Sequence, residues 1–145
     1  MHRQNVYLGK RCPEARDDIN GDGYLDIIET GLVMNNIIIP LDGDLSARMK
    51  GINLHPVGDQ YGSYFYEKET RYSTFLKDLK APDLFPEDNI VKLGRNEKFT
   101  LEGKSILIQG VAENSAIPDT VLSHGEVPAF KTLPVACGQF RKVLK

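Results

Sequence analysis

Short apolar runs separated by turn-forming residues dominate the pattern along the chain. Runs rich in β-branched and aromatic residues are typical of β-strands. They occupy residues 5–8, 32–40, 63–67, 99–101, 105–111 and 132–140. The fourth and fifth runs flank Glu102-Gly103-Lys104, which predicts a hairpin. In the fifth run Ile106 and Ile108 alternate with Leu107 and Gln109, so both faces are largely apolar and we expect a strand covered on each side.

One segment has the period of a helix instead. Its apolar side chains follow the spacing i, i+3, i+4 and i+7 at Tyr72, Phe75, Leu76 and Leu79. Thr70 or Ser73 is the expected N-cap, and the helix should end before Ala81-Pro82. Many short strands and one short helix predict a mostly β, β-sandwich-like single domain that covers residues 1–145.

The composition narrows the classes of partner. Among 145 residues, 18 Lys and Arg are balanced by 20 Asp and Glu, and the chain has no Trp and no run of basic residues. A net charge of −2 without a basic patch argues against binding to nucleic acid or anionic lipid. The longest apolar runs, 31–34 and 37–41, are far shorter than the ~18 residues of a membrane-spanning helix, so no membrane span is expected.

The two cysteines, Cys12 and Cys137, lie near opposite ends of the chain, without the spacing of a redox motif or a zinc finger. They form either one disulfide or two separate buried thiols, and we favour the disulfide. Such a bond indicates an oxidising compartment. The first residues lack the charged and then apolar pattern of an export signal. We therefore interpret the chain as a mature segment of a secreted or periplasmic protein with an added initiator Met.

Residues 18–29 carry a recognisable pattern of metal ligands. They read Asp-Ile-Asn-Gly-Asp-Gly-Tyr-Leu-Asp-Ile-Ile-Glu, which resembles the twelve-residue calcium loop of the EF-hand family. The expected oxygen ligands are the side chains of Asp18, Asn20, Asp22, Asp26 and Glu29, together with the carbonyl of Tyr24. Gly23 permits the tight turn because it has no Cβ. Ca²⁺ is the expected cofactor, since it removes the repulsion among the carboxylates, whereas Mg²⁺ usually retains several waters.

The sequence around this loop departs from the EF-hand family. Gly9 and Pro13 interrupt the stretch where that family has an incoming helix, and no second loop of this kind occurs in the chain. The segment therefore looks like the free-standing Asp-x-Asp-x-Asp-Gly sites of extracellular calcium modules. We expect the ion to have a structural role, in which it rigidifies the chain between the first strand and residues 37–39. Leu25 should point away from the ion into apolar surroundings.

The C-terminal part is similar to the last strands of the copper/zinc superoxide dismutase sandwich. The similar segments are Gly-Lys-Ser-Ile-Leu-Ile-Gln-Gly at 103–110 and Leu-Pro-Val-Ala-Cys-Gly-Gln-Phe at 133–140. The resemblance implies that Cys137 is a disulfide cysteine and that Cys12 stands near its partner. This chain has Gln109 where that family has a copper-binding His, and Pro134 where it has an active-site Arg. The catalytic chemistry is therefore not expected to carry over, and the missing early strands predict an open sheet edge.

These observations predict a non-enzymatic calcium-binding module with a structural or interaction role and no catalytic residues. The alternative is a superoxide dismutase-like or copper-handling sandwich, and a third class is a hydrolase that uses calcium structurally. His2, His55 and His124 are too few for a bimetal site. Besides the calcium ion, the expected partner is a second copy of the chain, because an open sheet edge invites strand addition.

Overall fold

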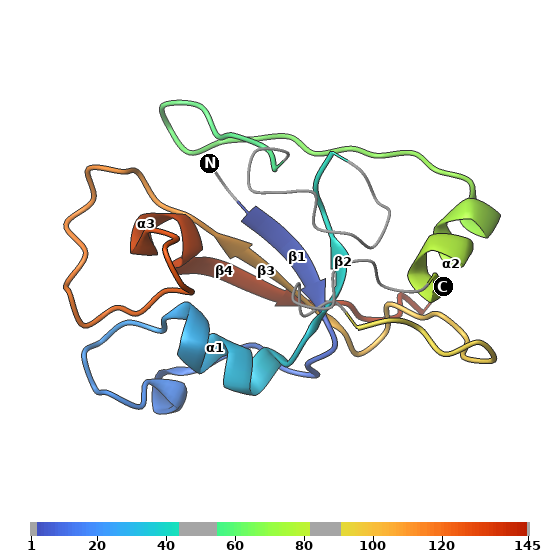
Figure 1. Ribbon diagram of the computed structural model, residues 1–145, viewed down its shortest axis with the longest axis horizontal. Helices are drawn as coiled ribbons and strands as arrows, with labels where there is room; N and C mark the ends of the chain where they lie inside the picture. The colour runs from blue at the N-terminus through green and yellow to red at the C-terminus, as the bar shows by residue number, and fades with distance from the viewer. Residues whose placement is uncertain (1–2, 44–54, 82–90, 145) are drawn as a thin grey trace.

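A four-stranded antiparallel sheet with the strand order β2-β1-β3-β4 lies at the centre of the computed structural model, which describes residues 3–43, 55–81 and 91–144 (Figure 1). In the described residues, the elements in chain order are β1 (Arg3–Tyr7), the 3-10 turn η1 (Ala15–Asp17), α1 (Ile27–Met34), β2 (Ile37–Pro40), α2 (Tyr72–Lys80), β3 (Ser105–Gln109), α3 (Ala129–Thr132) and β4 (Pro134–Gln139). The two central strands, β1 and β3, come from distant parts of the sequence. The described residues contain no second sheet.

The register of the sheet assigns its side chains to two faces. Val6 of β1 is paired with Ile39 of β2 and with Ile106 of β3, so these three side chains lie on the same face. On β3, Leu107 is paired with Cys137 of β4 and points to the opposite face. The structure confirms that β3 is covered on both sides, because its residues alternate between buried and half-buried.

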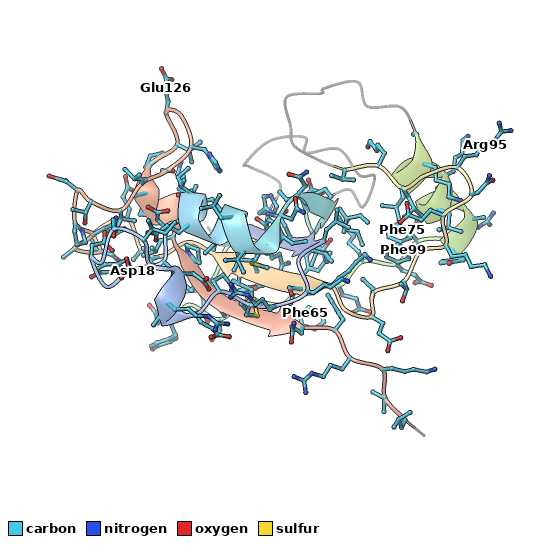
Figure 2. All side chains as sticks on the ribbon, turned by 90° about the horizontal axis from the view of Figure 1, so that it is seen from below. Asp18, Phe65, Phe75, Arg95, Phe99 and Glu126 are labelled. Atoms are coloured by element: carbon cyan, nitrogen blue, oxygen red, sulfur yellow. A yellow bond between two sulfur atoms is a disulfide. The ribbon has the colours of Figure 1, made fainter. Side chains whose placement is uncertain are left out.

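Each face of the sheet carries its own apolar core. Under α1, which lies over the sheet in Figure 2, the buried side chains are Tyr7, Met34 and Leu107. In the second core, Leu79 of α2 packs with Val6 and Ile39. The buried members of this second cluster are Val6, Ile38, Ile39, Leu79 and Leu93. Phe75 of α2 and Phe99 extend it with an edge-to-face contact, their ring centroids 5.3 Å apart.

The predicted helix is confirmed as α2, although its cap differs from the expectation. The N-cap residue is Arg71, whose side chain makes no capping hydrogen bond, so neither Thr70 nor Ser73 has that role. The predicted strand over 32–40 is wrong in its first half. Residues up to Met34 belong to α1, which ends at Asn35 with a positive φ of 63°, and only Ile37–Pro40 form β2.

Two further predicted strands are absent from the sheet. Residues 63–67 form an irregular segment, in which Tyr64 donates a hydrogen bond to the side chain of Gln4 (3.0 Å) and Tyr66 donates one to the carbonyl of Asp42 (2.8 Å). Residues 99–101 enter the turn before β3 without forming a strand of their own. Tyrosine hydroxyls, rather than strand pairing, thus attach the first of these segments to the sheet.

Cys12 and Cys137 form the predicted disulfide, with their Cα atoms 5.7 Å apart. Beside it, the side-chain amide of Gln139 donates a hydrogen bond to the carbonyl of Lys10. The segment that precedes the candidate calcium loop is therefore attached to β4, at one edge of the sheet. No helix in the described part of the chain is long and apolar enough to cross a bilayer.

Candidate calcium loop

The candidate loop, residues 18–29, leaves η1 and leads directly into α1. A bidentate ion pair holds the chain before the loop. Arg11 Nη1 lies 2.6 Å from Asp17 Oδ2, and Arg11 Nη2 lies 2.8 Å from Asp17 Oδ1. This guanidinium, aided by the backbone N–H of Glu14, holds the pKa of Asp17 well below its ordinary value. The entrance to the loop is thus fixed by Arg11 and, one residue later, by the disulfide of Cys12.

Asp18 organises the first half of the loop. Its Oδ1 accepts hydrogen bonds from the backbone N–H groups of Gly21 (2.7 Å) and Asp22 (3.2 Å), and its Oδ2 accepts one from Gly23 (2.9 Å). Gly21 and Gly23 have φ values of 70° and 85°, a conformation that a residue with a Cβ rarely adopts. The tight coil expected from the sequence is therefore present.

Asn20 and Asp22 continue the coil and contact a distant segment. Asn20 Oδ1 accepts from the N–H of Asp22 (3.0 Å), and Asp22 Oδ1 accepts from the N–H of Tyr24 (2.9 Å). The amide nitrogen of Asn20 donates to Asp22 Oδ2 and to the carbonyl of Thr120, each at 3.2 Å. A hydrogen bond from the Thr120 side chain lowers the pKa of Asp22, with smaller contributions from Tyr24 and Asn20.

Asp26 and Glu29 form a capping box at the start of α1. Asp26 Oδ1 accepts from the N–H groups of Ile28 (2.8 Å) and Glu29 (3.0 Å), while Glu29 Oε2 accepts from the N–H of Asp26 (3.2 Å). Glu29 Oε1 also accepts from Ile19 (2.7 Å) and Asn20 (3.2 Å). Glu29 therefore joins the end of the loop to its beginning. Both carboxylates are buried, with 1% of Asp26 and 6% of Glu29 exposed.

Hydrogen bonds already use most of the lone pairs in the loop. A carboxylate offers about four acceptor positions, and the side chains of Asp18, Asp26 and Glu29 each accept three backbone N–H donors. No group in the described residues donates to the carbonyl of Tyr24, which leaves that oxygen available. The described part of the chain holds no group of three or more His, Cys, Asp or Glu side chains arranged to hold a metal ion.

Within the part of the chain that the structure describes, no basic side chain balances the negative charge of the loop. The ion pairs of the described residues are Arg11 with Asp17 and Arg16 with Glu14, both outside the loop. Among the described residues, the carboxylates at positions 1, 5, 9 and 12 are therefore held by neutral hydrogen-bond donors. Leu25 lines a small apolar cavity of about 180 Å³ with Leu107 and Cys137, in agreement with its expected orientation toward apolar surroundings.

Two residues of the site were not found by sequence reasoning. The backbone N–H of Leu122 donates to Asp26 Oδ2 at 2.9 Å, and Thr120 contacts both Asn20 and Asp22. These residues lie about one hundred positions beyond the loop. No local pattern in residues 114–128 indicates the contact.

The residues singled out by the superoxide dismutase resemblance are dispersed or have another use. The side-chain amide of Gln109 is buried and donates to the carbonyl of Thr132 at 3.1 Å. His55 is buried and His124 is exposed, and His2 lies outside the described residues. Gln109 thus holds α3 against β3.

Comparison of the chain with protein-family models, with curated proteins and with solved structures found no match. The functional argument therefore depends on the chemistry and geometry of the chain's own residues.

Proposed function

We propose that residues 18–29 bind one Ca²⁺ ion and that the protein is a non-enzymatic structural or interaction module stabilised by that ion. The observation that carries the proposal is the combination of a complete ligand spacing with a closed loop whose four carboxylates have no basic partner among residues 3–43, 55–81 and 91–144. A divalent cation is the natural counter-charge for such a group. The expected ligands are the oxygens of Asp18, Asn20, Asp22, Asp26 and Glu29, with the Tyr24 carbonyl.

The hydrogen bonds of the loop imply that ion binding requires a local rearrangement. Bidentate coordination by Glu29 needs a lone pair on each oxygen, yet Oε1 already accepts from Ile19 and Asn20. At least one of these two N–H groups must be released. Asp26 Oδ1 likewise accepts two donors from the first turn of α1. We propose that Asp26 holds the ion through a bridging water, because direct ligation competes with its capping role.

The ion would link three parts of the fold that meet at the loop. The disulfide and the Arg11–Asp17 pair fix its entrance, and α1 begins at its exit. The disulfide is consistent with an extracellular location, where calcium is plentiful. We therefore propose a secreted or periplasmic protein in which calcium stabilises the connection between β1 and β2.

Titration calorimetry on chelator-stripped protein tests this function. We expect uptake of one calcium ion per chain, and we expect the change Asp18→Asn to weaken it strongly. Asp59→Asn is the matched control, because Asp59 Oδ1 also accepts two backbone N–H bonds, from Tyr61 (2.8 Å) and Ser63 (2.9 Å), at a site without the ligand pattern. Absence of calcium uptake, or equal loss in both variants, refutes the proposal.

Three finer expectations stay proposals. We propose that the four-stranded sheet is one layer of a β-sandwich-like fold and that β4 is the edge at which a second copy would add its strand. Light scattering at micromolar concentration distinguishes a monomer from such a dimer. Metal analysis of the purified protein addresses the copper-handling alternative, because stoichiometric copper with redox activity would favour it over calcium binding.

A further inference from the structure

We infer that Thr120 and Leu122 are positioning residues of the calcium site, through which the bound ion fixes the segment 111–128 against the start of α1. The inference rests on the proposed calcium binding and goes beyond it, because the ion would stabilise the position of the segment 111–128 as well as that of the loop. It starts from the contacts that these two residues make with three of the expected ligands: Asn20, Asp22 and Asp26.

The contact between Asp26 and Leu122 is the central one. Asp26 is only 1% exposed, and its Oδ2 accepts the Leu122 N–H while its Oδ1 caps α1. A hydrogen bond to a charged acceptor is stronger than one between neutral groups. Anything that immobilises the carboxylate of Asp26 therefore also immobilises residue 122.

A chain of hydrogen bonds leads from Leu122 into the sheet. The hydroxyl of Ser123 lies 2.7 Å from that of Thr132, and the carbonyl of Thr132 accepts the side-chain amide of Gln109 on β3. Val121 is buried between the two positioning residues. The segment is thus anchored at one point to the sheet and at another to the calcium loop, and only the second anchor involves the expected ligands.

The ion should strengthen this second anchor for an electrostatic reason. Without a cation, the negative side chains of Asp22 and Asp26 repel each other and have no basic partner among the described residues. A cation draws their carboxylates together, which keeps Asp22 on Thr120 and Asp26 on Leu122. Linkage is reciprocal, so the two contacts must in turn raise the affinity for calcium.

The controlled segment carries exposed polar residues at the same end of the molecule as the loop. Glu126 of this segment is exposed, and Figure 2 shows Glu126 and Asp18 at one end, with Phe75 and Phe99 at the other. His124 is exposed nearby in the sequence. Calcium would therefore decide whether this surface is presented in one fixed arrangement.

Amide hydrogen exchange measured by NMR tests the inference. We expect saturating calcium to slow exchange at the Leu122 N–H about tenfold or more relative to the chelator-treated protein. The matched control amide is that of Ser63, which also donates to a carboxylate, Asp59, but lies outside the loop and should change little.

A pair of variants supplies the reciprocal measurement. Thr120→Val removes a hydroxyl with little change of shape, and we expect calcium affinity to fall about fivefold. Thr100→Val is the control, because the Thr100 hydroxyl accepts the N–H of Glu102 in a turn away from the loop (3.1 Å), and its affinity should equal that of the wild type.

The outcomes separate this inference from the proposed function. Calcium uptake with unchanged Leu122 exchange, or with unchanged or tighter affinity in Thr120→Val, overturns the inference and leaves calcium binding intact. Absence of uptake in calorimetry overturns both. Slower exchange at Leu122 together with weaker binding by Thr120→Val supports the assignment.

Discussion

The substitution Glu29→Gln is the sharpest test of the loop, because it keeps the shape of the side chain and removes one charged oxygen. Glu29 accepts three N–H bonds while only 6% exposed, two on Oε1 and one on Oε2. A Gln amide nitrogen accepts none, so at least one of these three N–H groups loses its partner. A lost hydrogen bond to a charged group costs about 1.5–3 kcal/mol, and we expect the calcium-free variant to be destabilised by that amount.

With calcium, the same change should also abolish a stabilisation that the wild type gains. A dissociation constant of ~10 μM in ~1 mM calcium stabilises the folded state by about 2.7 kcal/mol. The unfolding entropy of a chain of this length converts this free energy into a rise of about 9 °C in the melting temperature. The wild-type protein should show that rise, and Glu29→Gln only a small fraction of it.

Thermal melts followed by circular dichroism, with calcium and with chelator, measure both effects. Glu126→Gln is the control, because Glu126 is exposed and extends into solvent (Figure 2), and its calcium-induced rise should match that of the wild type. Two results contradict the reasoning: a calcium-induced rise in Glu29→Gln as large as in the wild type, or identical wild-type midpoints in both conditions.

Three further predictions address the fold. A Cβ at Gly9 would lie 2.5 Å from the backbone of Met34, the last residue of α1, so Gly9→Ala should lower the free energy of unfolding in urea by about 1–3 kcal/mol. Gly31 lies within α1 and has open space around it, so Gly31→Ala should raise the free energy of unfolding by about 1 kcal/mol. Replacing both Cys12 and Cys137 by Ser should lower the free energy of unfolding by about 5 kcal/mol, seen as a lower urea midpoint. Burial and a nearby carboxylate raise the pKa of Tyr66 to about 12, so an ultraviolet titration should show one tyrosine ionising near that pH, absent in Tyr66→Phe. Since unfolded tyrosine ionises near pH 10, the stability contributed by this group should fall between pH 10 and about 12 and be lost above it.

Some local features follow from local patterns in the sequence. The helical period from Tyr72 to Leu79 predicts α2, and Gly23 predicts the tight coil of the loop, in which Gly21 also has a positive φ. These features depend on residues close together in the chain, so spacing is sufficient to find them. The sequence left open whether Cys12 and Cys137 form a disulfide or remain separate thiols. The fold places Cys12 beside Cys137 of β4, and the two form a disulfide.

The prediction of a strand was wrong for the first half of residues 32–40, although the sequence contained a signal for a helix there. Asp26 and Glu29 stand three residues apart, which is the signature of a helix N-terminus, but they were interpreted only as metal ligands. The predicted strand at residues 63–67 was wrong for another reason. Alternating tyrosines suit a strand, but here their hydroxyls bond to Gln4 and to the Asp42 carbonyl, which only the tertiary structure provides.

The contact of Asp26 with Leu122 lies beyond any reasoning from spacing. It joins a carboxylate to a backbone N–H across 96 positions, and every non-proline residue has such an N–H group. Nothing in the identity of residue 122 marks it as a partner. Long-range bonds to the main chain are therefore invisible until the fold is known.

The strand order has a consequence for how the chain reaches its native state. β1 is synthesised first, yet one of its two neighbours, β3, begins about one hundred residues later, and β4 follows β3. The β1–β3 ladder can close only once residue 109 is available, and the β3–β4 ladder must wait for residue 139. Pairings between such distant segments close slowly because of their loop entropy. We therefore expect folding to be slower than in helical proteins of equal length.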